Sequence, residues 1–106
     1  MNPKALSRLQ ARAEILKAMA HPSRLFIIEE LEQGERCVCE LQEKIGSDFS
    51  TVSKHLSVLK NAGLVEDARR GNQVFYTLRC PCILKFLGCL ETVLRQNAQA
   101  RMELVK

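Results

Sequence analysis

The 106-residue sequence contains no apolar run that approaches the ~20 residues needed to span a membrane. Its first residues, 1–14, also lack the apolar core of a signal peptide. We therefore expect a cytoplasmic protein with reduced thiols and no membrane partner. The length suits one domain and not two, so a single domain over residues 1–106 is expected.

Signatures of catalysis are also missing. The chain has no phosphate-binding loop, no evident pair of catalytic carboxylates and no Cys-His-Asn set. Cys80-Pro81-Cys82 has one residue between its cysteines where thiol oxidoreductases have two, and no βαβ pattern surrounds it. We expect neither an enzyme, nor an organic cofactor, nor a small-molecule substrate.

Five cysteines, an odd number, exclude a complete disulfide framework within one chain. In a reducing compartment, clustered cysteines favour metal binding or redox sensing. The net charge of +4 permits a nucleic-acid partner without requiring one, so the positions of the charges must decide.

Apolar residues at helical spacing predict helices over residues 4–20, from 22 to about 34, and over 39–46. His21-Pro22 separates the first two, because the residue before a proline avoids the α region. Cys39 stands where a helix N-cap is expected, and Gln42, three residues later, would complete a capping box.

The most informative segment is 47–76. Asp48 is a good N-cap for a helix over about 49–62, which Gly63 would end. No acidic residue lies between Phe49 and Gly63, as suits a helix lying against phosphates. Residues 64–69 and 73–79 predict a hairpin with a basic turn, so that 64–79 form a wing.

This pattern predicts binding to double-stranded DNA, with the 49–62 helix in a major groove and the hairpin tip on the backbone or in the minor groove. The alternative is a solvated polar helix beside a solvated turn. For His55 a packing role is as open as a base contact. The candidate contact residues are Ser50, Thr51, Ser53, Lys54, His55, Ser57, Arg69, Arg70, Asn72 and Gln73.

A last helix is expected over residues 83–104 with a wide apolar face. This helix and the one over 4–20 carry more apolar residues than a lone small domain can bury. Pairing them across a two-fold axis would cover both stripes, so we expect a homodimer.

The segment 21–78 resembles the ArsR/SmtB family of metal-responsive repressors over most of the chain. The resemblance implies a mainly α fold with a small β-hairpin, a winged helix-turn-helix in the order α-α-α-α-β-β-α. It also implies a dimer, release of operator DNA when an effector binds, a recognition helix at 48–62 and a wing tip at 69–73.

Cys37-Val38-Cys39 is similar to the motif that binds arsenite in the arsenic-sensing branch of that family. Soft thiolates suit As(III) as the effector, and also Sb(III), Cd(II), Pb(II) or Zn(II). Two residues apart in an extended segment, both side chains point the same way, whereas in a helix they diverge. Our hypothesis is that chelation disrupts the first turn of the 39–46 helix, which packs against the recognition helix.

Many arsenic sensors have a third cysteine where this chain has Gln42, so further ligands would have to be Cys80, Cys82 or Cys89. Cys80 and Cys82 repeat the chelating spacing, and both pairs together would suit tetrahedral zinc or cadmium. Core packing is the alternative for Cys80 and Cys89. The zinc site of histidines and carboxylates that other members have on the last helix has no counterpart.

Two other regulatory functions stay open at this point. The same thiols would serve a repressor that answers oxidants or reactive sulfur by forming a disulfide or a sulfur bridge. A purely architectural DNA-binding protein would show no sequence preference.

Overall fold

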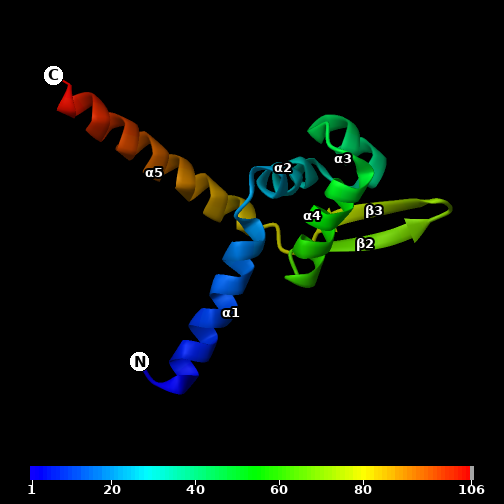
Figure 1. Ribbon diagram of the computed structural model, residues 1–106, viewed down its shortest axis with the longest axis horizontal. Helices are drawn as coiled ribbons and strands as arrows, with labels where there is room; N and C mark the ends of the chain where they lie inside the picture. Colours follow the sequence, from blue (N-terminus) through cyan, green and yellow to red (C-terminus); the bar gives the residue numbers. More distant parts are fainter. Residues whose placement is uncertain (106) are drawn as a thin grey trace.

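The computed structural model describes residues 1–105, which form five α-helices, a short 3₁₀ turn and a three-stranded sheet (Figure 1). In chain order these are α1 (Pro3–Met19), α2 (Pro22–Glu30), η1 (Leu31–Gln33), β1 (Arg36–Cys37), α3 (Val38–Ile45), α4 (Phe49–Asn61), β2 (Val65–Arg70), β3 (Gln73–Leu78) and α5 (Ile83–Leu104). The predicted winged helix-turn-helix is confirmed, with β1 as an addition.

Local capping explains where α4 begins and ends. The Asp48 carboxylate accepts a hydrogen bond from the Thr51 N–H at 2.8 Å, and the hydrogen bonds from Thr51 hold the pKa of Asp48 below its usual value. After Asn61 the chain turns at Gly63, whose φ of +81° favours glycine. Both ends lie within a residue of the prediction.

The start of α3 differs from the prediction. Cys37, not Cys39, is the N-cap, and Glu40, not Gln42, completes the capping box. The Cys37 Sγ accepts from the Glu40 N–H at 3.3 Å, and the Glu40 carboxylate accepts from the Cys37 N–H at 3.1 Å. The helix therefore begins at Val38, one residue before the predicted boundary. With Cys37 as the cap, the third helical residue is Glu40, and its carboxylate completes the capping box in place of Gln42.

The sheet has the order β1-β3-β2 with antiparallel pairing throughout. β2 and β3 form the predicted hairpin, with Val65 opposite Leu78 and Arg70 opposite Gln73. β1 was not predicted. Its two residues pair with Tyr76 and Phe75, nearly forty positions away, and a two-residue strand leaves no periodic signal in a sequence.

The core lies where α2, α3 and α4 meet the inner side of the sheet. Its fully buried side chains come from these helices and from the first residue of β2: Ile27, Ile28, Leu41, Val52, Leu56, Leu59 and Val65. Val52, Leu56 and Leu59 recur at the three- and four-residue spacing of one helix face. The core therefore fixes α4 against α2 and α3.

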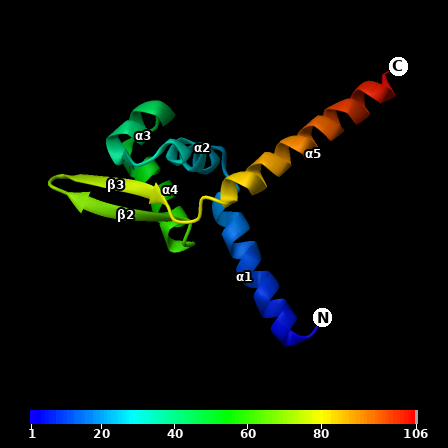
Figure 2. The ribbon, with the colours of Figure 1, turned by 180° about the vertical axis from the view of Figure 1, so that it is seen from behind.

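Helices α1 and α5 extend away from this core in diverging directions, as opposite views show (Figures 1 and 2). The radius of gyration is 16.8 Å, compared with about 13 Å for a compact domain of this size. Both helices leave apolar side chains exposed in the single subunit: Leu9, Leu16, Phe86, Leu90, Val93 and Leu94. Within residues 1–105, no helix has the length and apolar character needed to cross a membrane.

Candidate nucleic-acid interface

The polar face of α4 is open to solvent along most of its length. Ser50, Thr51, Lys54 and Ser57 are exposed, and Ser53 is half-buried. Asp48 at the N-cap is the nearest carboxylate before this face, and Lys60 near its end pairs with Asp67 of β2 at 3.0 Å. The face therefore offers hydroxyl groups and the exposed ammonium group of Lys54 to a ligand with phosphates and base edges.

His55 differs from the other candidates because it turns toward the protein. Its ring lies 4.4 Å from that of His21, centroid to centroid, and the residue is half-buried. Burial lowers the pKa of His55, and the charges of His21 and Arg24 lower it further. These contacts belong to the packing alternative, in which His55 helps to hold α4 on α2.

The wing tip presents Arg69, Asn72 and Gln73 as exposed side chains around the turn at Gly71. Arg70 is also exposed but has partners. Its guanidinium lies 4.0 Å above the Phe75 ring and forms a two-pronged ion pair with Glu35. Arg70 thus lies across the sheet. To contact DNA, its guanidinium would have to leave the Glu35 carboxylate and pair with a phosphate instead.

The sequence pair Cys37 and Cys39 is joined by a disulfide, with 5.3 Å between the Cα atoms. Cys37 is extended, at φ −79° and ψ 160°, while Cys39 lies in the first turn of α3. The bend between them brings the two sulfurs together, which neither an ideal strand nor an ideal helix does by itself. Both residues line an open cavity of about 230 Å³.

That cavity connects the cysteine pair to both candidate DNA-binding elements. Its other walls come from the start of α4 and from the wing: Val38, Phe49, Arg69, Asn72, Gln73 and Val74. A change at the sulfurs is therefore adjacent to Phe49 and to the wing tip. The expected coupling ran only through the packing of α3 on α4, so this second connection is a finding of the structure.

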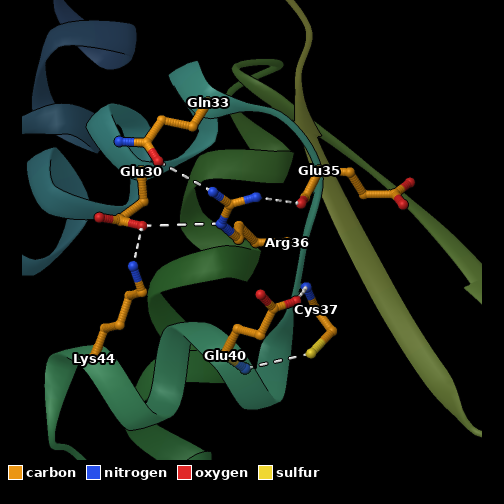
Figure 3. A network of polar contacts seen from close by, with 7 residues as sticks. All are labelled: Glu30, Gln33, Glu35, Arg36, Cys37, Glu40 and Lys44. Carbon is orange, nitrogen blue, oxygen red and sulfur yellow. Dashed lines mark hydrogen bonds and ion pairs between the residues drawn. The ribbon is translucent and has the colours of Figure 1, made fainter.

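A polar network fixes β1, and with it Cys37, against the helices (Figure 3). Arg36 donates to the Gln33 side chain at 3.2 Å and to the Glu35 carbonyl at 2.9 Å, and its Nε lies 3.9 Å from Glu30. Glu30 also pairs with Lys44 of α3 at 3.0 Å. The position of the disulfide is thus tied to α2, η1 and α3.

The remaining cysteines lie apart from this pair. Cys80, Cys82 and Cys89 are free and exposed in the single subunit, so core packing of Cys80 and Cys89 within one subunit is wrong. Cys37 pairs with Phe75 within β3, whereas Cys80 and Cys82 follow the end of β3 at Leu78. In residues 1–105, no three His, Cys, Asp or Glu side chains converge on a possible metal position.

Among the described residues, the two cysteine pairs of one subunit therefore do not form a four-thiolate site. The sequence reasoning also missed three residues at the interface. Phe49 is 57% exposed at the start of α4, Val74 lines the cavity, and Glu35 holds Arg70. Phe49 carried a signal, since a large aromatic residue directly after an N-cap has no place in a solvated polar face.

Comparison with known proteins assigns the chain to a family. The family model described as "Bacterial regulatory protein, arsR family" matches residues 21–67. The HTH-type transcriptional regulator Rv0081 of Mycobacterium tuberculosis is 34% identical over 96 residues, 90% of this chain and 84% of the relative. The biofilm growth-associated repressor of Xylella fastidiosa is 37% identical over 81 residues, 76% of this chain and 71% of the relative.

Solved structures agree with the fold. The crystal structure of Rv0081 superposes with a TM-score of 0.78 at 35% identity, covering 96% of this chain and 99% of that one. The homodimeric winged helix-turn-helix domain Mb0332 from Mycobacterium bovis gives a TM-score of 0.77 at 29% identity, covering 91% and 89%. These relatives are regulators rather than enzymes, and the chain belongs to the arsR family of bacterial regulatory proteins, as a winged helix-turn-helix transcriptional regulator.

Proposed function

We propose that the chain is a homodimeric repressor that binds double-stranded operator DNA and releases it when the chemical state of Cys37 and Cys39 changes. The observation that carries the proposal is the cavity that the two cysteines share with Phe49 of α4 and with the wing. It places the sulfurs next to the elements that would hold the DNA. The relative from Xylella fastidiosa is named a repressor, which supports repression, rather than activation, as the effect of DNA binding.

DNA binding rests on the exposed, acid-free face of α4 and on the cations of the wing tip. Lys54 stands on that face, and Arg69 flanks it from the wing. Two copies of the chain would place two such helices in successive major grooves. The uncovered apolar faces of α1 and α5 supply the surface for pairing, and the homodimer of Mb0332 supports this arrangement.

Disulfide formation is the effector chemistry that the geometry supports best. The Cys37 and Cys39 sulfurs are bonded while Cys37 caps α3 and the helix runs from Val38, so the oxidised state fits the fold. Formation from the thiols gives up two electrons and two protons to a two-electron oxidant such as a peroxide. The reduced pair, in this proposal, leaves the start of α3 free to adjust and retains DNA, whereas the closed pair releases it.

Binding of a thiophilic metalloid is the second candidate. Once reduced, the two converging sulfurs would chelate As(III), or Sb(III), Cd(II), Pb(II) or Zn(II), and soft thiolates are the donors that such centres prefer. The donor set fits a centre that takes two thiolates from the subunit. A third ligand would have to come from solvent or from the partner, since the described residues bring no third donor to the pair.

Titration of a reduced protein–operator complex separates the two candidates. Release on addition of arsenite, zinc or cadmium would support the metalloid, and release on addition of peroxide or persulfide alone would support the disulfide. The double variant C37S/C39S should bind operator as well as the wild type and fail to release it. Cys89→Ser, which removes an exposed thiol elsewhere, is the matched control and should release normally.

A second measurement tests the DNA interface itself. Lys54→Ala should weaken operator binding, because it removes the exposed cation of the α4 face. Footprints on operator and random DNA at matched salt would show whether binding is specific. Equal affinity for both DNAs would contradict the proposal of an operator-specific repressor and would support an architectural DNA-binding protein.

A further inference from the structure

Phe49, the first residue of α4, is a large aromatic side chain that the fold leaves open to solvent. It is 57% exposed, and within residues 1–105 it belongs neither to the hydrophobic core nor to the apolar side chains packed against that core. The other exposed large apolar residue of α4 is Val58, near the opposite end of the helix. Single exposed apolar residues are common on proteins, so the surroundings of Phe49 must decide what it does.

The capping of α4 does not use the Phe49 ring. The Asp48 carboxylate caps the helix by accepting the Thr51 N–H. A hydrophobic staple would join the residue before the cap to the fourth helical residue, and these are Ser47 and Val52. Pairing of two subunits leaves the ring uncovered as well, because α1 and α5 extend away from the side of the molecule that carries α3 and the wing (Figure 1).

The surroundings of Phe49 fit a nucleic acid. The ring shares its cavity with Arg69, Asn72 and Gln73 of the wing, and no carboxylate is among the residues that line this cavity. Ser53 stands one turn further along α4. Cations, amides and hydroxyl groups are the donors that contact phosphates and base edges. The ring therefore lies inside the candidate DNA surface and not beside it.

The chemistry of a phenyl ring narrows its partner on DNA. The ring cannot form hydrogen bonds with base edges, and the apolar group that base pairs present in the major groove is the 5-methyl group of thymine. The N-terminal residues of a recognition helix are those that reach base edges, and Phe49 opens α4. Wedging of a side chain between stacked bases belongs to proteins that bind the minor groove.

We propose that Phe49 is a specificity-determining residue of the operator interface, and that its ring packs on the 5-methyl group of a thymine in each half-site. The inference rests on the proposed repressor function, because it requires α4 in the major groove. The operator should then contain a T·A pair at one fixed position of each half-site, mirrored across the two-fold axis of the dimer.

Removal of single methyl groups from the DNA tests this contact. Selection from a random-sequence duplex library by the full chain, with and without reductant, supplies the binding site. Each thymine of the selected duplex is then replaced in turn by deoxyuridine, which lacks only the 5-methyl group. We expect a symmetric pair of positions at which replacement weakens binding roughly fourfold for each half-site, which corresponds to ~0.8 kcal/mol.

Phe49→Ala should abolish this difference, so that the variant binds the thymine and deoxyuridine duplexes equally at that position. Its dependence on the other base pairs should remain. Val58→Ala is the matched control, because it removes the other exposed apolar side chain of α4, and it should keep the fourfold difference. Thermal unfolding of both variants would verify that they fold like the wild type.

The outcomes separate this contact from the repressor function. If Phe49→Ala keeps the full preference for thymine over deoxyuridine, the contact is overturned while the repressor stands. The same holds if the wild type selects a sequence in which no thymine methyl matters, a result that needs no variant. A wild type that selects no sequence at all would overturn the repressor and this contact together.

Discussion

The imidazole rings of His21 and His55 lie 4.4 Å apart and tilted by 42°, which joins the N-cap of α2 to the middle of α4. The Nδ1 atom of His21 accepts the Ser23 N–H at 3.0 Å. Arg24 lies close enough for its charge to act on His55. The contact between α2 and α4 therefore includes two adjacent imidazole rings, and His55 is the direct neighbour of Lys54.

The first prediction concerns pH. The pKa of His55 is lower in the folded protein than its ordinary value of 6.5. Below pH 6.5, the unfolded chain therefore binds a proton at His55 more readily than the folded protein does. The contribution of His55 to the free energy of unfolding should therefore be constant above pH 6.5. It should decrease as the pH falls below 6.5 toward the lower pKa of the folded state. Chemical denaturation of wild type and His55→Gln across this range would measure it.

In His55→Gln the decrease below pH 6.5 should become smaller, since the residue no longer titrates. All other ionisable groups are the same in both proteins and provide the common background. An identical pH dependence in the two proteins would contradict the assigned role of His55.

The second prediction separates the two roles of Cys37, as helix cap and as disulfide partner. Under reducing conditions Cys37→Ser should keep most of the stability, because the hydroxyl still accepts the Glu40 N–H. Cys37→Ala should lose about 1 kcal/mol, the usual effect of removing a cap. Urea denaturation with a reductant would measure both, and equal losses would show that the sulfur does not cap α3.

The third prediction concerns the core between α3 and α4. Leu41 is completely buried, so Leu41→Ala should reduce the free energy of unfolding by roughly 2–5 kcal/mol. Leu104, at the end of α5, is 85% exposed in the subunit, and Leu104→Ala should change it by less than about 0.5 kcal/mol. A small effect at Leu41 would mean that α3 is not packed against α4 as described.

The parts predicted correctly from the sequence are those with local causes. Asp48 and Gly63 define the ends of α4 through their own hydrogen bonds and backbone angles, and the alternation in residues 73–78 defines β3. What was missed depends on residues distant in the chain. β1 exists because Arg36 and Cys37 meet β3, and the cap moved to Cys37 because β1 holds it extended at the start of α3.

The site shows the same division. Exposure of Lys54 and of the wing tip followed from the polar pattern, which is a local property. The contact of Phe49 with the cysteine cavity and the pairing of Arg70 with Glu35 join segments from different parts of the chain. No spacing rule contains these contacts, so they required the tertiary structure.

The last prediction concerns Glu35, which holds the wing cation Arg70. Glu35→Gln removes both the ion pair and a negative charge beside the wing, so Arg70 becomes free to meet phosphate. Since the pair is partly exposed, its loss involves about 0.2–1 kcal/mol, and operator binding should strengthen by about 1.5- to 5-fold at low salt. Binding assays over a range of salt concentrations would measure the change.

Glu32→Gln is the matched control, because it removes the same charge three residues earlier in an exposed position of η1. It should strengthen binding less than Glu35→Gln does. Arg70→Ala should weaken binding and flatten the salt slope by about one unit, and adding Glu35→Gln to it should recover little. If Glu35→Gln strengthens binding equally with and without Arg70, the effect comes from general charge and the ion pair does not restrain the wing.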